Sequence, residues 1–265
     1  MTTVVDQRVL EQLVALSHEL GDPRNDYAIL AEGNTSALVA DDRFLLKASG
    51  SSLCQATTTS FVPVSLEGVR QMLDSPPAND EQLTRALMGC RLEDGPLRPS
   101  TEAPLHALAL TIGGARWVGH THPSPVNAVL CSERAEAIVE GALFPDQIVV
   151  CGLHPLFIPY ADPGIPLALA FRDRLLEHRK LHGAPPKTVY LQNHGLIALG
   201  ASPGEVLRIH AMVVKSARIL AGALAIGGAS YLTARHAERI ETRQDEHHRR
   251  TALARTDPTG MSDSP

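Results

Sequence analysis

The segment ARWVGHTHPSP, residues 115–125, places two histidines two positions apart behind a run of strand-forming residues. Its tryptophan and valine favour a β-strand, and Pro123 closes that strand. Side chains two residues apart in a strand point to the same face of a sheet. His120 and His122 can therefore converge on one metal ion, or they are two neighbouring surface histidines in a chain that contains 12 histidines.

A third ligand is available in VYLQNHGLIALG, residues 189–200. His194 stands at the end of a short apolar strand, beside Gly195, where the backbone can bend sharply. A catalytic zinc ion usually has three protein ligands and an open position for water or substrate. A metal ion held in this way polarises a carbonyl and stabilises the enolate that forms when a proton or a carbon group leaves the adjacent carbon.

Chemistry of this kind also needs a base, and PSTEAPLH, residues 99–106, offers Glu102. Glu102 lies at the start of an expected helix, which Ser100 and Thr101 can cap. Burial would raise the pKa of this glutamate and suit it to act as a base at neutral pH. The alternative is a first-turn glutamate that complements the helix dipole and has no catalytic role.

Composition narrows the class of partner. A chain of 265 residues with 44% apolar residues is long enough for one sizeable domain with a full core. The net charge of −5 and the 4% aromatic content argue against a nucleic-acid or anionic-membrane surface and favour a small-molecule partner. The longest apolar run, ILAGALAIGGA at 219–229, is too short to span a bilayer.

The expected location is a reducing cytoplasm. The four cysteines show no CxxC spacing. The first residues, MTTVVDQRVLEQLVALSHEL, form an amphipathic helical pattern without the basic and apolar regions of a signal peptide.

Local patterns predict alternating helices and strands. A hairpin is expected, with SALVA and RFLLKAS as its strands and a DD turn between them. Helices are predicted at 6–20, 65–74, 101–114, 123–141, 165–182 and from Pro203 onward, and further strands at 147–152 and 187–195. The segment 154–164 is predicted to be a loop. From about Thr242 the apolar periodicity is lost, so we expect a folded domain over 1–241 and a partly disordered tail over 242–265.

Four separated motifs share their order with one known family. They are GNTS at 33–36, KASG at 47–50, STEAPLH at 100–106 with GHTHPSP at 119–125, and QNHGLIALG at 192–200. Over roughly residues 8–225 the chain resembles the class II aldolase/adducin family. Its motifs are most similar to those of the aldolase part of rhamnulose-phosphate aldolase proteins. The resemblance implies a single-domain α/β/α fold with a central, largely antiparallel sheet flanked by helices.

The resemblance also implies roles for the reactive residues. His120, His122 and His194 match the zinc ligands, with another divalent transition metal as the alternative ion. Glu102 matches the glutamate that removes and returns the substrate proton. Tyr160 matches a tyrosine that protonates the aldehyde oxygen from a neighbouring subunit of a homotetramer, and a packed loop tyrosine is the alternative interpretation.

A phosphate pocket is implied by the remaining motifs. The matching residues are Asn34, Ser49, Gly50, Ser100 and Thr101, and Lys47 adds a positive charge. Hydroxyls and backbone N–H groups of glycine-containing turns and a helix N-terminus bind anions well. Without the other motifs, the GNTS and KASG segments would be interpreted as ordinary turns.

Glu102 narrows the reaction within the family. The epimerases of this family characteristically have aspartate at this position, whereas its dehydratases keep glutamate. The adducin heads of the family lack a complete metal site. The expected function is a zinc-dependent lyase that cleaves a ketose 1-phosphate into dihydroxyacetone phosphate and an aldehyde. The alternatives are a sugar-phosphate dehydratase or decarboxylase, or a non-catalytic adducin-like module.

Overall fold

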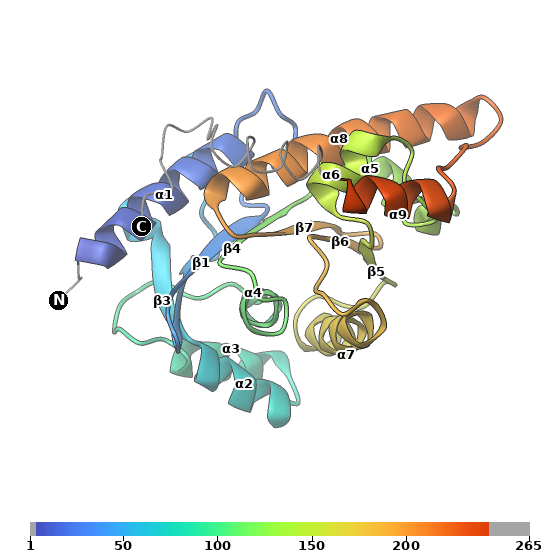
Figure 1. The fold of residues 1–265 in the computed structure, drawn as a ribbon. Helices are drawn as coiled ribbons and strands as arrows, with labels where there is room; N and C mark the ends of the chain where they lie inside the picture. Colours follow the sequence, from blue (N-terminus) through green and yellow to red (C-terminus); the bar gives the residue numbers. More distant parts are fainter. Residues whose placement is uncertain (1–3, 244–265) are drawn as a thin grey trace.

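A seven-stranded sheet runs through the centre of residues 4–243, the part of the chain that the computed structural model describes (Figure 1). The strand order is β3-β2-β1-β4-β7-β6-β5. Every neighbouring pair is antiparallel except β5 and β6. The predicted, largely antiparallel sheet is therefore confirmed. The strands are β1 (Asn34–Ala40), β2 (Arg43–Lys47), β3 (Phe61–Ser65), β4 (Trp117–Thr121), β5 (Leu156–Ile158), β6 (Thr188–Leu191) and β7 (Gly195–Gly200).

Helices cover both faces of this sheet (Figure 1). One face carries α1, α5 and α8, and the other carries α2, α4 and α7. A separate apolar cluster lies between the sheet and the helices on each face. The helices are α1 (Val4–Leu20), α2 (Leu66–Asp74), α3 (Asp80–Gly89), α4 (Ala103–Thr111), α5 (Ser124–Leu130), α6 (Pro145–Cys151), α7 (Ile165–His182), α8 (Pro203–Ala225) and α9 (Ala234–Thr242), with short 3-10 turns at Thr58–Ser60 and Ala135–Ile138.

Strand alternation divides the core between the two faces. Trp117 packs on the α1 and α8 side, whereas Val118 packs on the α4 and α7 side. Leu196 and Ile197 of the neighbouring strand divide in the same way. A sheet buried on both faces therefore has nearly continuous apolar strands. His120 is two residues beyond Val118, so the same alternation turns it toward the α4 face.

Three of the sequence predictions for the middle of the chain differ from the structure. The sequence predicts a strand for QIVVCG at 147–152, but Pro145–Cys151 form α6. A short apolar run is compatible with either structure, and here Ile148 and Val149 pack against Ala237 and Ile240 of α9. Pro145 also occupies the first turn, where a missing N–H costs nothing.

The segment predicted as the loop 154–164 contains β5, which pairs in parallel with β6 at the edge of the sheet. Prolines at 155 and 159 flank this short strand, and an edge strand tolerates them. The single helix predicted over 123–141 is divided into α5 and a 3-10 turn at Ala135–Ile138.

Other predictions hold. The hairpin of β1 and β2, the helix α7 over 165–182 and the start of α8 at Pro203 are confirmed. Residues 244–265, most of the predicted tail, lie outside the described residues, so the division at 241 and 242 stays a prediction. Within residues 4–243, no helix is both long and apolar enough to cross a membrane.

Candidate metal and acid–base site

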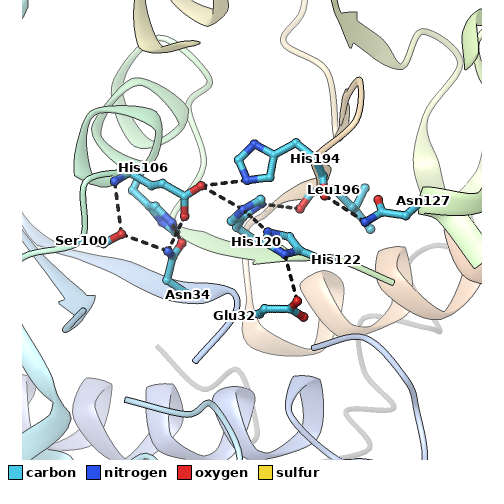
Figure 2. A network of polar contacts seen from close by, with 10 residues as sticks. Glu32, Asn34, Ser100, His106, His120, His122, Asn127, His194 and Leu196 are labelled. Atoms are coloured by element: carbon cyan, nitrogen blue, oxygen red, sulfur yellow. Dashed lines mark hydrogen bonds and ion pairs between the residues drawn. The ribbon is translucent and has the colours of Figure 1, made fainter. Parts of the chain in front are cut away.

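Three histidines from two distant parts of the chain converge at one end of the sheet (Figure 2). His120 lies in β4, His122 comes just after it, and His194 lies in the turn between β6 and β7. Thr121 pairs with Leu196, so this turn is held beside the end of β4. The Nε2 atoms of His120 and His122 are 3.0 Å apart. One ligand atom from each ring lies within 4.8 Å of the others.

The geometry of this group suits a divalent ion such as zinc. His120 is 1% exposed, and its Nδ1 donates to the Leu196 carbonyl at 2.9 Å, which leaves Nε2 available to a metal ion. Tetrahedral zinc with nitrogen ligands at 2.0–2.1 Å separates two of those nitrogens by about 3.3 Å. The distance of 3.0 Å between His120 and His122 is close to this value. Among the described residues, no other set of His, Cys, Asp and Glu side chains has such an arrangement.

The carboxylate of Glu102 lies against the histidines. Its Oε1 is 3.2 Å from Nε2 of His120 and 3.1 Å from Nε2 of His194. Its Oε2 accepts a hydrogen bond from Nδ2 of Asn34 at 2.7 Å. Burial on its own raises the pKa of Glu102, but the two facing imidazoles hold that pKa well below its usual value. The expectation of a raised pKa is therefore wrong, because the paired rings outweigh desolvation.

The segment before α4 brings Ser100 and Glu102 to this site. Asn34 pairs with His120 in the register of β1 and β4, so its side chain reaches the same end of the sheet. The Ser100 hydroxyl accepts from the Glu102 amide at 3.2 Å and from Asn34 Nδ2 at 3.3 Å. The predicted cap by Ser100 or Thr101 is not present, because Glu102 is the N-cap residue of α4 and makes no side-chain cap hydrogen bond. Thr101 is half-buried and lies directly before Glu102.

The turn after β2 carries the other residues of the predicted phosphate pocket. The Ser49 amide donates to the Arg98 carbonyl at 3.0 Å, which ties this turn to the segment that contains Ser100. Gly50 has a φ of +82° and open space around its Cα. Lys47 is turned inward and is 1% exposed, and its Nζ donates to the Ala48 carbonyl at 3.2 Å. Burial lowers the pKa of Lys47 to about 8.

Tyr160 does not join this group within the same chain. It is 57% exposed, and its hydroxyl donates to Asp162 at 3.0 Å. Its backbone amide donates to the Gln192 side chain at 3.1 Å, two residues before His194. The phenol therefore faces outward from a loop that is anchored beside the site.

Two contacts of the histidines were not identified from the sequence. Oε1 of Glu32 lies 3.9 Å from Nδ1 of His122, on the outer side of that ring (Figure 2). Nδ2 of Asn127 donates to the backbone carbonyl of His194 at 3.0 Å. The one sequence signal for Glu32 was its place directly before the GNTS motif at 33–36.

The bend beside His194 is also located differently from the prediction. Asn193, and not Gly195, has the left-handed backbone, with φ of 54°. Asparagine tolerates this conformation better than most residues. Gly195 is needed for space, because a Cβ atom there would lie 2.5 Å from the Thr121 carbonyl oxygen and 2.7 Å from Cδ2 of His122.

Comparison with known proteins identifies the family of this chain. Residues 11–221 match the family model described as the class II aldolase and adducin N-terminal domain. The chain belongs to the class II aldolase and adducin family. Class II aldolases depend on a metal ion, and the three histidines form the group that could hold it.

One relative by sequence has a different description. The Bacillus subtilis (strain 168) protein named uncharacterized oxidoreductase YuxG is 25% identical over 199 residues, which are 72% of this chain and 26% of that protein. The chain therefore spans about a quarter of the length of that relative.

Solved structures share the class II aldolase fold. An L-fuculose 1-phosphate aldolase aligns with a TM-score of 0.66 and 17% identity, over 88% of this chain and 94% of that one. YgbL from Escherichia coli, described as a candidate aldolase/epimerase/decarboxylase, aligns with a TM-score of 0.65 and 18% identity, over 89% and 99%. At these identities the likeness is one of fold.

Proposed function

We propose that this protein is a zinc-dependent lyase that reversibly cleaves a ketose 1-phosphate into dihydroxyacetone phosphate and an aldehyde. One observation carries the proposal: Oε1 of Glu102 lies within 3.2 Å of Nε2 of both His120 and His194. A carboxylate beside a three-histidine metal site combines a base with an electrophile, which is what carbon–carbon cleavage next to a carbonyl requires.

Each residue of the site has a defined part in this reaction. His120, His122 and His194 would hold the ion, which polarises the substrate carbonyl when it is bound. Glu102 returns a proton to the carbon that loses the aldehyde, and in the reverse direction it removes that proton. Removal of the proton requires a carboxylate that is ionised and close to the reacting carbon, and its return requires the protonated acid. The low pKa of Glu102 supports the ionised form.

The phosphate end of the substrate is assigned to the turn and helix start beside Glu102. Ser49, Gly50, Ser100 and Thr101 supply hydroxyl and amide groups there, and the bond from the Ser49 amide to Arg98 keeps the two segments together. Oriented N–H groups and hydroxyls can bind a dianion with few full positive charges. The inward position of Lys47 makes it a support of the turn and not a direct phosphate ligand.

Tyr160 is assigned to a neighbouring subunit's site in a homotetramer. Its exposure of 57% and its absence from the Glu102 group of its own chain support a role across a subunit boundary. There the phenol would protonate the aldehyde oxygen in the condensation direction, in which that oxygen becomes a hydroxyl, and in cleavage the same proton would pass back from the hydroxyl to the phenolate oxygen.

The test combines metal analysis with a screen of ketose 1-phosphates. The wild-type protein should contain about one divalent ion per chain and should release dihydroxyacetone phosphate with an aldehyde. Glu102→Gln should keep the ion but lose exchange of the enolisable substrate proton with solvent, because an amide cannot act as the base. His122→Ala should lose most of the ion.

Other outcomes would point to other members of the family. Loss of water from a ketose phosphate, without aldehyde, would assign a dehydratase, and release of carbon dioxide from an added sugar-acid phosphate would assign a decarboxylase. A wild-type protein that binds no divalent ion and turns over none of these compounds would support an adducin-like binding module. Proton exchange at the wild-type rate in Glu102→Gln would remove Glu102 from the base role.

A further inference from the structure

We infer that Gln192 is a positioning residue for Tyr160, because its side chain joins the loop after β5 to the turn that carries His194. The inference rests on the acid role proposed for Tyr160. Its basis is the way in which Gln192 continues the pairing of β5 with β6 at the edge of the sheet (Figure 1).

The pairing of β5 with β6 extends beyond the last residues of the two strands. Ile158 pairs with Leu191 in the parallel register, and the Gln192 amide donates to the Ile158 carbonyl at 3.0 Å. In a regular parallel ladder, the next hydrogen bond would run from the Tyr160 amide to the main-chain carbonyl of Gln192. Pro159 does not interrupt this ladder, because the nitrogen of an alternate residue faces the open edge of the sheet.

The side chain of Gln192 takes the place of that main-chain carbonyl. The Tyr160 amide donates to Oε1 of Gln192 at 3.1 Å. The chain turns toward β7 at this point, where Asn193 has a left-handed φ of 54° and the His194 amide donates to the Leu191 carbonyl at 3.1 Å. Gln192 thus holds the loop after β5 beside the turn that carries His194.

The orientation of the Gln192 carboxamide follows from its partner. A backbone N–H can only donate, so the atom that faces the Tyr160 amide is the side-chain oxygen. The other end of the loop is held by α7, because the Leu167 amide donates to the Asp162 carbonyl at 3.1 Å. The Tyr160 hydroxyl donates to the Asp162 side chain at 3.0 Å. The phenol is therefore fixed between Gln192 on one side and the first turn of α7 on the other.

The consequence is that Gln192 should affect one part of the proposed reaction and not the other. Exchange of the enolisable proton of dihydroxyacetone phosphate with solvent uses Glu102 and the metal ion, and no aldehyde oxygen takes part in it. Cleavage and condensation also use the phenol of Tyr160. Catalytic groups displaced by about 1 Å can lose about 100-fold in rate. Loss of the Gln192 hydrogen bond therefore predicts slower cleavage with unchanged proton exchange.

The test replaces the acceptor with a side chain of similar length. Gln192→Met should lower kcat for ketose 1-phosphate cleavage by about 10-fold to 100-fold. The rate of proton exchange in dihydroxyacetone phosphate and the ion content should both match those of the wild-type protein. Gln192→Glu keeps an oxygen that accepts from the Tyr160 amide, so it should recover most of the lost rate.

Gln71→Met is the matched control. Gln71 lies in α2, where its side chain donates to Glu67 at 2.8 Å, so this variant should leave cleavage and proton exchange unchanged. A second control places Gln192→Met in a Tyr160→Phe background. There it should lower cleavage no further, because the phenol that it positions is already absent.

Three kinetic results would overturn the inference. Unchanged cleavage in Gln192→Met would show that the phenol does not depend on this hydrogen bond. Equal losses of cleavage, proton exchange and bound ion would show that Gln192 supports the His194 turn instead. A further loss of cleavage in the Tyr160→Phe background would show that Gln192 acts on another group.

An activity-independent measurement keeps the inference and the proposed function apart. Hydrogen–deuterium exchange at the Tyr160 amide should be faster in Gln192→Met than in the wild-type protein, and close to wild type in Gln192→Glu. Equal protection in all three proteins would overturn the inference. Wild-type cleavage by Tyr160→Phe would instead overturn the acid role in the proposed function, while the Tyr160 amide would still decide whether Gln192 fixes this loop.

Discussion

Replacing Gly195 by alanine tests the close packing of β7 against the histidine site. The new Cβ atom would lie 2.5 Å from the Thr121 carbonyl oxygen and 2.7 Å from Cδ2 of His122, so the strands or the ring must shift. Overpacking of a filled site costs about 1–3 kcal/mol. Alanine also reduces the freedom of the unfolded chain, which offsets about 0.4–1 kcal/mol. When the second effect is subtracted from the first, the free energy of unfolding should fall by about 1–2 kcal/mol.

For a domain of this size, such a loss lowers Tm by about 2–8 °C. The measurement is thermal unfolding of the metal-free protein, followed by circular dichroism. Because the His122 ring is one of the groups that must move, zinc affinity measured by chelator competition should also fall, by about 10-fold or more.

Gly222→Ala provides the matched control. Gly222 lies in α8, and a Cβ atom there would meet nothing within 4 Å. Alanine should stabilise this helix by about 0.5–1 kcal/mol and raise Tm by about 1–4 °C, with zinc affinity unchanged. If Gly195→Ala melts at or above the wild-type temperature and binds zinc equally well, the close approach of β7 to Thr121 and His122 is not a constraint, and the reasoning fails.

Two further predictions concern the neighbours of the site. The first mixes inactive Glu102→Gln protein with inactive Tyr160→Phe protein so that subunits exchange. Part of the activity should return, because some subunit boundaries pair an intact Glu102 with an intact Tyr160. Subunit exchange without recovery of activity would exclude Tyr160 from this role. Glu32→Ala should weaken zinc affinity by about 10-fold to 100-fold, because Oε1 of Glu32 faces the outer nitrogen of His122 at 3.9 Å. The surface variant Glu81→Ala should leave that affinity unchanged, and an equal effect of both would reduce the role of Glu32 to net charge.

Much of the fold could be predicted from local sequence. The hairpin of β1 and β2 follows from two short apolar runs separated by a two-residue turn, and α7 follows from the uninterrupted helical run from Ile165 to His182. Both depend on residues close together in the chain, so their physical causes are visible in the sequence itself. The 147–152 segment predicts a strand because its few apolar residues suit a strand or a helix equally, and their contact with α9 favours the helix.

The same distinction applies to the site. The spacing of His120 and His122 on one strand predicts from sequence alone that the two rings share a face, since strand geometry relates residues two apart. The partner of Asn34, the outer contact of His122 with Glu32 and the inward turn of Lys47 could not be obtained in this way. Asn34 and Glu102 are 68 positions apart in the chain, and they meet because β1 lies beside β4 while α4 begins over the same end of the sheet. The sequence thus determined which reactive groups the protein has, and the pairing of distant strands decided which of them touch, because hydrogen bonds and desolvation act over a few ångströms in space, whatever the separation along the chain.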